Sequence, residues 1–311
     1  MADAVVEVGA GWAVAAALLL AAVAVAGACL DGILAARTAG GASGAGAAKP
    51  LNEAARLLRQ RRRTTVAADA PLWRIGGAGL LVVALLMVAV VPFGRWTVAD
   101  LSVGVVWFNA MDVTVWALVW LAGWGPNSAH ALMGGYRFLA LALSYELPLM
   151  FALTAPAVGA GSLRIADVVA AQQGLWFVVW MPVAFVVFCG SVVAFSVWGP
   201  FAHPAGADIA GGVLAEVSGI DRLLLLAGRY ALLAAGAAFA VPLFLGGGSG
   251  PLLPDWAWVL VKTLLLLAAL VALRRRLPAV RPDRFVEAGW IMLIPAVLLQ
   301  VLLVSVVTVG G

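Results

Sequence analysis

Charged side chains are scarce in this chain. Asp, Glu, Lys and Arg make up 11% of its 311 residues, whereas hydrophobic residues make up 64%. An ordinary soluble domain carries about 25% charged residues, and its interior is too small to hide so much apolar surface. The composition therefore excludes a soluble fold and predicts a protein whose solvent is lipid.

Cysteine and histidine are also rare, which limits the redox and metal chemistry open to the chain. Cys29 and Cys189 lie far apart within apolar runs, so we expect two buried thiols rather than a disulfide framework or an iron–sulfur cluster. His130 and His203 have no partner at metal-ligand spacing. We therefore expect no catalytic residue, no metal site and no cofactor bound by this chain; any electrons would arrive through neighbouring subunits.

Long apolar runs predict an all-α, polytopic membrane protein, with about eight transmembrane helices in one transmembrane domain, residues 1–311. Crossing a bilayer takes roughly 20 apolar residues. The runs that approach or exceed this length are 12–34, 75–93, 103–123, 130–157, 175–198, 223–246, 255–273 and 287–309. We expect the first run not to be a cleaved signal peptide, because Asp3 and Glu7 precede it where a signal would carry positive charge.

Basic residues are distributed unevenly between the two sides of these spans. Segments 34–74, 199–222 and 274–284 fall on one side and hold fourteen of the nineteen Lys and Arg residues, whereas the opposite loops hold only Arg95 and Arg164. Loops rich in Lys and Arg remain in the cytoplasm, so we expect both termini outside. Arginines beside a membrane bind anionic lipid or acidic partner surfaces. No basic groove with interleaved aromatic residues is apparent, so they do not indicate nucleic acid.

The cytoplasmic segment 35–74 contains a predicted amphipathic helix. After a flexible Gly/Ala stretch, the run LNEAARLLRQRRR places its apolar residues at roughly helical spacing. These residues are Leu51, Ala54, Ala55, Leu57 and Leu58. We expect such a helix to lie on the membrane surface or under a docked partner.

The fourth span contains the strongest candidate for a proton-transfer residue, Glu146. Pro148 cannot donate to the carbonyl of Ser144, so the helix is expected to kink and the freed carbonyl needs another partner. A carboxyl beside such a break is a plausible site of proton exchange. The alternative is a protonated Glu146 in a structural interhelical hydrogen bond. Arg137 lies half a revolution away and must find an acid or a carbonyl elsewhere.

Two further ionisable residues lie within apolar runs. Asp112, with Asn109 one turn before it, could extend a proton path, pair with Arg137 or form a structural polar contact. Lys262 could form a functional ion pair, or extend its amine to the membrane interface. Charged groups inside spans are costly, so both are candidates for function.

Five ordered motifs carry a resemblance to a known family. They are G-W-x-x-N-S from Gly123, S-Y-E at Ser144–Glu146, G-P-L-L-P from Gly250, V-K-T at Val261–Thr263, and R-x-x-L-P-x-x-R-x-D-x-x-x-x-x-G-W ending at Trp290. With their spacing, the chain from Arg37 to Leu299 resembles the quinone-pocket membrane subunit of respiratory complex I (NADH-quinone oxidoreductase), which is the H subunit in bacteria and subunit 1 in mitochondria. It looks like a divergent member.

The loop 199–222 departs most from the family pattern. It corresponds to the family's acidic quinone-pocket loop, and it keeps Pro200, Phe201, Glu216 and a candidate acid at Asp208, while most other family acids are replaced by alanine or deleted. The resemblance implies quinone-pocket roles for Arg37, Pro200, Phe201 and Arg137. It also implies proton-transfer roles for Glu146, Lys262, Glu216 and Asp208. Asp112 is a further proton-transfer candidate, at a position where the family usually has no acid.

The resemblance also implies a function for the assembled complex. The chain would be a non-redox membrane subunit in a bacterial plasma membrane, linking quinone reduction to proton movement. Its partners would be peripheral iron–sulfur and quinone-site subunits that carry the clusters and the flavin, antiporter-like membrane subunits, quinone and lipid. One alternative is the membrane anchor of a related energy-converting hydrogenase or ferredoxin-linked complex. A stand-alone transporter is disfavoured because no inverted repeat is apparent.

Overall fold

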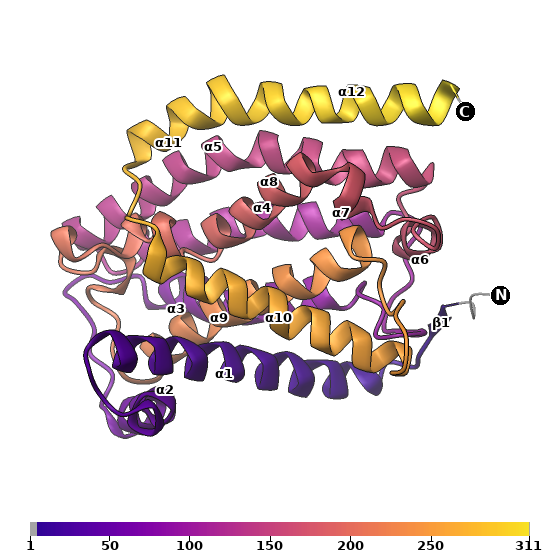
Figure 1. Cartoon of the computed structure of the whole chain (residues 1–311). Helices are drawn as coiled ribbons and strands as arrows, with labels where there is room; N and C mark the ends of the chain where they lie inside the picture. Colours follow the sequence, from indigo (N-terminus) through magenta and orange to yellow (C-terminus); the bar gives the residue numbers. More distant parts are fainter. Residues whose placement is uncertain (1–4, 311) are drawn as a thin grey trace.

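The computed structural model describes residues 5–310 and shows an almost wholly helical protein, so Asp3 lies outside the described residues. Most of the long helices run side by side along one direction, with the long C-terminal helix on one flank and the first helix on another (Figure 1). The described part contains seven helices that are long and apolar enough to cross a membrane. The prediction of an all-α polytopic membrane protein is confirmed.

Six of these seven are uninterrupted α-helices, and the seventh combines three consecutive elements. The six are α1 (Trp12–Thr38), α3 (Ala70–Val88), α4 (Gly104–Trp124), α5 (Ala129–Ala160), α9 (Gly219–Phe244) and α10 (Asp255–Arg276). The seventh runs over Pro282–Gly310 and comprises α11 (Pro282–Ala288), the π-helix η5 (Gly289–Leu293) and α12 (Ile294–Gly310).

The fifth predicted span, 175–198, is not one continuous helix. It is divided into α7 (Phe177–Trp180) and α8 (Pro182–Phe195), and α8 has only 14 residues. Pro182 causes the division, because it has no N–H to continue the hydrogen-bond ladder and it disfavours helical backbone at Met181. This segment is therefore an interrupted span, shorter than a bilayer-crossing helix.

The second span begins and ends five residues before the predicted limits of 75 and 93. Its start at Ala70 follows from local chemistry. The Asp69 carboxylate accepts a hydrogen bond from the N–H of Leu72 at 3.2 Å, and Pro71 occupies the first turn, where its missing N–H costs nothing. Arg74 therefore lies inside this helix.

The three basic segments meet at one end of the bundle. This end holds α2 (Ser43–Arg59) and the 3-10 turns η1 (Gly199–Phe201), η2 (His203–Ala205), η3 (Ala207–Ile209) and η4 (Gly212–Leu214). The N–H of Arg63 donates to Ser218 Oγ at 2.8 Å, and Arg62 forms an ion pair with Asp221 at 3.2 Å. The predicted amphipathic helix is present within α2, where Leu57 is buried and Leu51 is exposed. The helix already begins at Ser43, inside the Gly/Ala stretch predicted to be flexible.

The opposite end is closed by a short parallel strand pair. Strand β1 (Val6–Glu7) pairs with β2 (Trp96–Thr97), and α6 (Ile165–Ala170) covers the same end. Both β1 and the last turn of α12 lie at this end, away from α2 (Figure 1).

Small residues and stacked aromatic rings hold the helices together. A Cβ on Gly76 of α3 would lie 2.5 Å from the backbone nitrogen of Ala122 in α4, so only glycine permits this approach. In the centre, the rings of Phe108 and Phe239 stack with centroids 3.9 Å apart, joining α4 to α9. This packed core fixes α4 against its neighbours, and α4 carries half of the candidate site.

Candidate functional site

The structure brings Asp112 and Glu146 together in the bundle interior. Asp112 and Asn109 share one face of α4, and Tyr145 and Glu146 lie opposite on α5. The Tyr145 hydroxyl donates to Asp112 Oδ1 at 3.4 Å, and Asn109 Nδ2 donates to Glu146 Oε1 at 3.2 Å. The Asp112 and Glu146 carboxyl groups lie close enough for the charge of one to influence the other.

This acid pair is buried and has no cationic partner. Asp112 is 0% exposed and Glu146 is 9% exposed. No Lys or Arg among the described residues forms an ion pair with either of them. Three oxygens of the cluster have no hydrogen-bonding partner within the described chain: Asn109 Oδ1, Asp112 Oδ2 and Glu146 Oε2. Two carboxylates in contact repel one another strongly, so such a pair is suited to holding a proton.

Helix α5 continues through Pro148 beside Glu146, although proline cannot donate to the carbonyl of Ser144. The carbonyl of Ser144, which Pro148 leaves without its helical donor, faces Gly289 in the π-helix, and a Cβ on Gly289 would lie 2.7 Å from it. The Ser144 hydroxyl donates instead to the carbonyl of Ala140 at 2.7 Å. Two backbone irregularities, a proline break and a π-helix, therefore meet one turn from the acid pair.

Arg137 finds its partner in the loop that follows α8, not in Asp112. Its guanidinium lies 2.7 Å from the Asp208 carboxylate and 3.4 Å from the carbonyl of His203. The expectation that Asp112 could pair with Arg137 is therefore wrong, because Arg137 lies half a revolution round α5 from Glu146 and nearer the basic end of the helix. The hydrogen bond from Arg137 lowers the pKa of Asp208 below its ordinary value. Asp208 is thus a fixed carboxylate in this conformation.

The other loop candidates occupy separate places at the basic end. Pro200 is buried and its carbonyl accepts from the N–H of Val280 at 2.8 Å, while Phe201 packs on Phe285 with ring centroids 4.4 Å apart. The Glu216 carboxylate accepts from Ser128 Oγ at 2.8 Å, just before α5 begins. Arg37 lies at the turn between α1 and α2, where its Nε donates to Ser43 at 3.1 Å.

Lys262 is engaged by backbone carbonyls rather than by an acid. Its Nζ donates to the carbonyls of Leu245 at 2.7 Å, Gly247 at 2.9 Å and Ser249 at 2.8 Å, and lies 4.1 Å from the centroid of the Trp176 ring. The expected ion pair is not formed among the described residues, and Lys262 is 7% exposed, so its amine is directed into the protein. The ammonium stabilises the turn that follows α9, whose free carbonyls attract a cation.

A buried acid that the sequence reasoning passed over lies near the basic end of α1. Asp31 is 7% exposed and accepts from Arg274 Nη1 and Arg275 Nη2, both at 2.8 Å, and from the hydroxyl of Tyr230 at 3.4 Å. The neighbouring Arg229 donates to the carbonyls at the end of α8. Asp31 could have been found as an acid inside the first predicted span.

The motif G-W-x-x-N-S forms the turn between α4 and α5. Trp124, Asn127 and Ser128 line a hollow of about 290 Å³ between α4 and the start of α5. Asn127 adopts the left-handed backbone conformation with φ 50°, which asparagine tolerates better than most residues. The same turn presents Ser128 to Glu216, so the motif and the retained loop acid are in contact.

Comparison with known proteins identifies the family. Residues 11–305 match the family model described as NADH dehydrogenase. The chain belongs to this family. It is 37% identical over 269 residues to the NADH-quinone oxidoreductase H subunit 2 of Geobacter sulfurreducens, covering 83% of this chain and 82% of the relative. It is 36% identical over 268 residues to the H subunit 1 of Geobacter metallireducens, with the same coverage, 83% and 82%.

The family match extends to bacteria beyond Geobacter. The chain is 34% identical over 259 residues to the NADH-quinone oxidoreductase H subunit 2 of Cereibacter sphaeroides, covering 82% of this chain and 81% of the relative. The resemblance to the bacterial H subunit that the motifs carry is confirmed. Asp112, Asn109 and Tyr145 are consequently the features to interpret within this family, because they surround the glutamate of the S-Y-E motif.

Proposed function

We propose that this chain is the membrane subunit that links quinone reduction to proton movement in a complex of the NADH-quinone oxidoreductase type. The H subunit relatives support the place in the complex. The buried pair of Asp112 and Glu146 is the single observation that carries the proposed role, because it offers a proton site inside the membrane without any bound cofactor.

The pair works as one unit that holds a variable number of protons. With both carboxyls protonated it is neutral, and with one proton it carries a single negative charge shared between them. A change in nearby charge or water access shifts this balance, so the pair takes up or releases a proton. Tyr145 and Asn109 orient one oxygen of each acid and leave the other oxygen available for proton exchange.

In this proposal, the loop 199–222 forms one wall of the quinone pocket. Pro200, Phe201 and the pair of Arg137 with Asp208 would shape it, and Arg37 would lie at its edge. Since Asp208 is held by Arg137, Glu216 is the retained loop acid best able to exchange protons, with Ser128 as its hydroxyl partner. Quinone is the substrate of the complex; its electrons would come from iron–sulfur clusters and a flavin held by partner subunits.

The proposed setting is a bacterial plasma membrane with both termini outside. The basic end would then face the cytoplasm and receive the peripheral subunits, and antiporter-like subunits would pack beside the helices in the membrane. The three basic segments, which hold fourteen Lys and Arg residues, lie at one end of the helix bundle, and this supports the orientation.

Purification of the intact complex through a tag on this chain tests the proposal. Co-purification of NADH-quinone oxidoreductase subunits, with quinone-dependent oxidation of NADH, is the expected result. Recovery of a nickel-site large subunit would contradict it and select the alternative, a membrane anchor of an energy-converting hydrogenase. Recovery of the chain alone with solute transport would also contradict it.

A further inference from the structure

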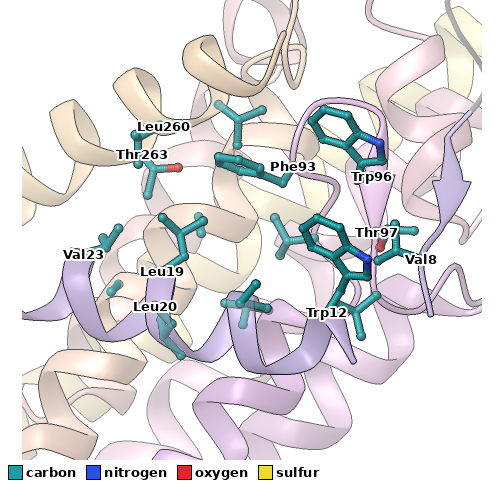
Figure 2. Close-up of a pocket in the computed structure, with 18 residues that line it drawn as sticks. Val8, Trp12, Leu19, Leu20, Val23, Phe93, Trp96, Thr97, Leu260 and Thr263 are labelled. Atoms are coloured by element: carbon teal, nitrogen blue, oxygen red, sulfur yellow. The ribbon is translucent and has the colours of Figure 1, made fainter. Parts of the chain in front are cut away.

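A large apolar hollow in the described part of the chain is lined by none of the residues of the acid pair or of the quinone-type loop. It is about 390 Å³ in volume and lies between α1, α9 and α10, near the end that carries the strand pair. Figure 2 shows Leu19 and Val23 on α1 facing Leu260 and Thr263 on α10, with Phe93 reaching between them. None of the quinone-pocket candidates lines it.

The lining suits a hydrocarbon and offers a ligand almost no polar partner. Sixteen of the eighteen lining residues are apolar, and the other two are Thr97 and Thr263. The hydroxyl of Thr97 is already directed at the carbonyls of Ala89 and Ala99, at 3.3 Å each. An apolar space of this kind does not hold water, so its natural occupant is an alkyl chain.

Its position places the hollow at the boundary between hydrocarbon and headgroups. Trp12 and Trp96 stand at the strand end of the hollow (Figure 2) and are 62% and 40% exposed. Tryptophan concentrates at this depth in membranes. Further along α1, Leu18 and Val25 are 67% and 45% exposed, so the face beside the hollow is apolar. By the distribution of basic residues, this is the outer half of the bilayer.

The hollow fits a single alkyl chain better than a partner helix. Backbone bonds close its outer end: the N–H of Val6 donates to the carbonyl of Arg95 at 2.7 Å, and that of Val8 to the carbonyl of Thr97 at 2.9 Å. A helix with its side chains is about 10–12 Å wide and needs an open groove. At the rim, the exposed indoles of Trp12 and Trp96 mark the depth at which lipid headgroups begin.

We propose that this hollow is a binding site for one acyl chain of an outer-leaflet phospholipid, whose headgroup lies at the level of Trp12 and Trp96. The chain fills the space between α1 and α10 near their outer ends. At their other ends these two helices are joined by the ion pairs of Asp31 with Arg274 and Arg275. At the ends near the hollow, where α1 and α10 present mainly apolar side chains, the bound acyl chain joins the two helices.

Photolabelling of the intact complex in lipid nanodiscs tests this site. The probe is phosphatidylglycerol with a diazirine near the end of one acyl chain. We expect peptides containing Leu19 and Leu260 to be labelled several-fold more than the peptide containing Val306 on α12, which is exposed but lines no part of the hollow.

Variants that fill the hollow distinguish binding of a lipid chain inside it from general contact with the surrounding lipid. Ala16→Phe on α1 and Ala238→Phe on α9 place a ring in the hollow, and Ala22→Phe on α1 is the matched control because Ala22 does not line it. Labelling of Leu260 should fall several-fold in either filling variant that assembles and persist in the control. Equal labelling in all three, labelling no stronger than at Val306, or displacement of the probe by a quinone with a long isoprenoid tail would overturn the proposal.

Discussion

Replacing Lys262 by methionine should destabilise the turn that follows α9 rather than stop proton movement directly. The substitution keeps an unbranched side chain but removes the ammonium, which leaves the carbonyls of Leu245, Gly247 and Ser249 without their donor. An unsatisfied buried polar group costs about 1–3 kcal/mol. Because Leu245 and Ser249 are only partly buried, we expect a total loss of about 2–5 kcal/mol from the free energy of unfolding.

The assay is reversible unfolding of the purified chain in mixed micelles with increasing sodium dodecyl sulfate. Lys49→Met is the control, because Lys49 is exposed and is the only other lysine. Trp176→Phe should give a smaller loss, about 1–2 kcal/mol, since it weakens the cation–π contact and removes the hydrogen bond from Trp176 Nε1 to Ser249 Oγ. A Lys262→Met variant as stable as the control, with reduced proton-coupled turnover in the complex, would refute this reasoning and favour a proton-transfer role.

Three further predictions concern the π-helix, the ion pair of Asp208 with Arg137, and the orientation in the membrane. Gly289→Ala forces a methyl group against a carbonyl of α5 and should cost about 1–3 kcal/mol in the same unfolding assay; an unchanged value would mean that the π-helix shifts freely. The pKa of Asp208 is lowered by Arg137, so the stability lost in Asp208→Asn should be constant above about pH 5 and disappear as the pH falls through the lowered pKa; a difference that grows in acid would contradict the ion pair. In a cysteine-free background on intact cells, an impermeant thiol reagent should label cysteine introduced at Gly248 but not at Ala279; the reverse pattern would invert the orientation.

The overall architecture was predictable because each long span is set by local composition. Seven of the eight apolar runs form long helices, since in lipid the backbone must satisfy its own hydrogen bonds. Boundaries were less predictable. Asp69 and Pro71 start α3 five residues earlier than hydropathy suggests, and Pro182 divides the fifth run, although the hydrophobic pattern continues through it.

The residues of the site were predictable singly, but their partners were not. Glu146 and Asp112 stand out as acids in apolar runs, yet only the packing of α4 on α5 brings them together. The sequence predicts that Arg137 needs a partner, and it leaves Lys262 with two alternatives, an ion pair or extension to the interface. Their partners, Asp208 and three backbone carbonyls, lie in loops whose positions follow from the folded chain and not from local sequence.

The acid pair is the central claim, and proton uptake by membrane vesicles containing the intact complex tests it most directly. Asp112→Asn and Glu146→Gln each preserve shape and remove one proton site. We expect normal assembly, reduced proton uptake per quinone reduced in each single variant, and no further loss in the double variant, because the two acids act as one unit. Glu287→Gln, at an exposed ion pair with Arg284, should match the unmodified complex. Full proton uptake in both single variants, with normal quinone reduction, would contradict the account.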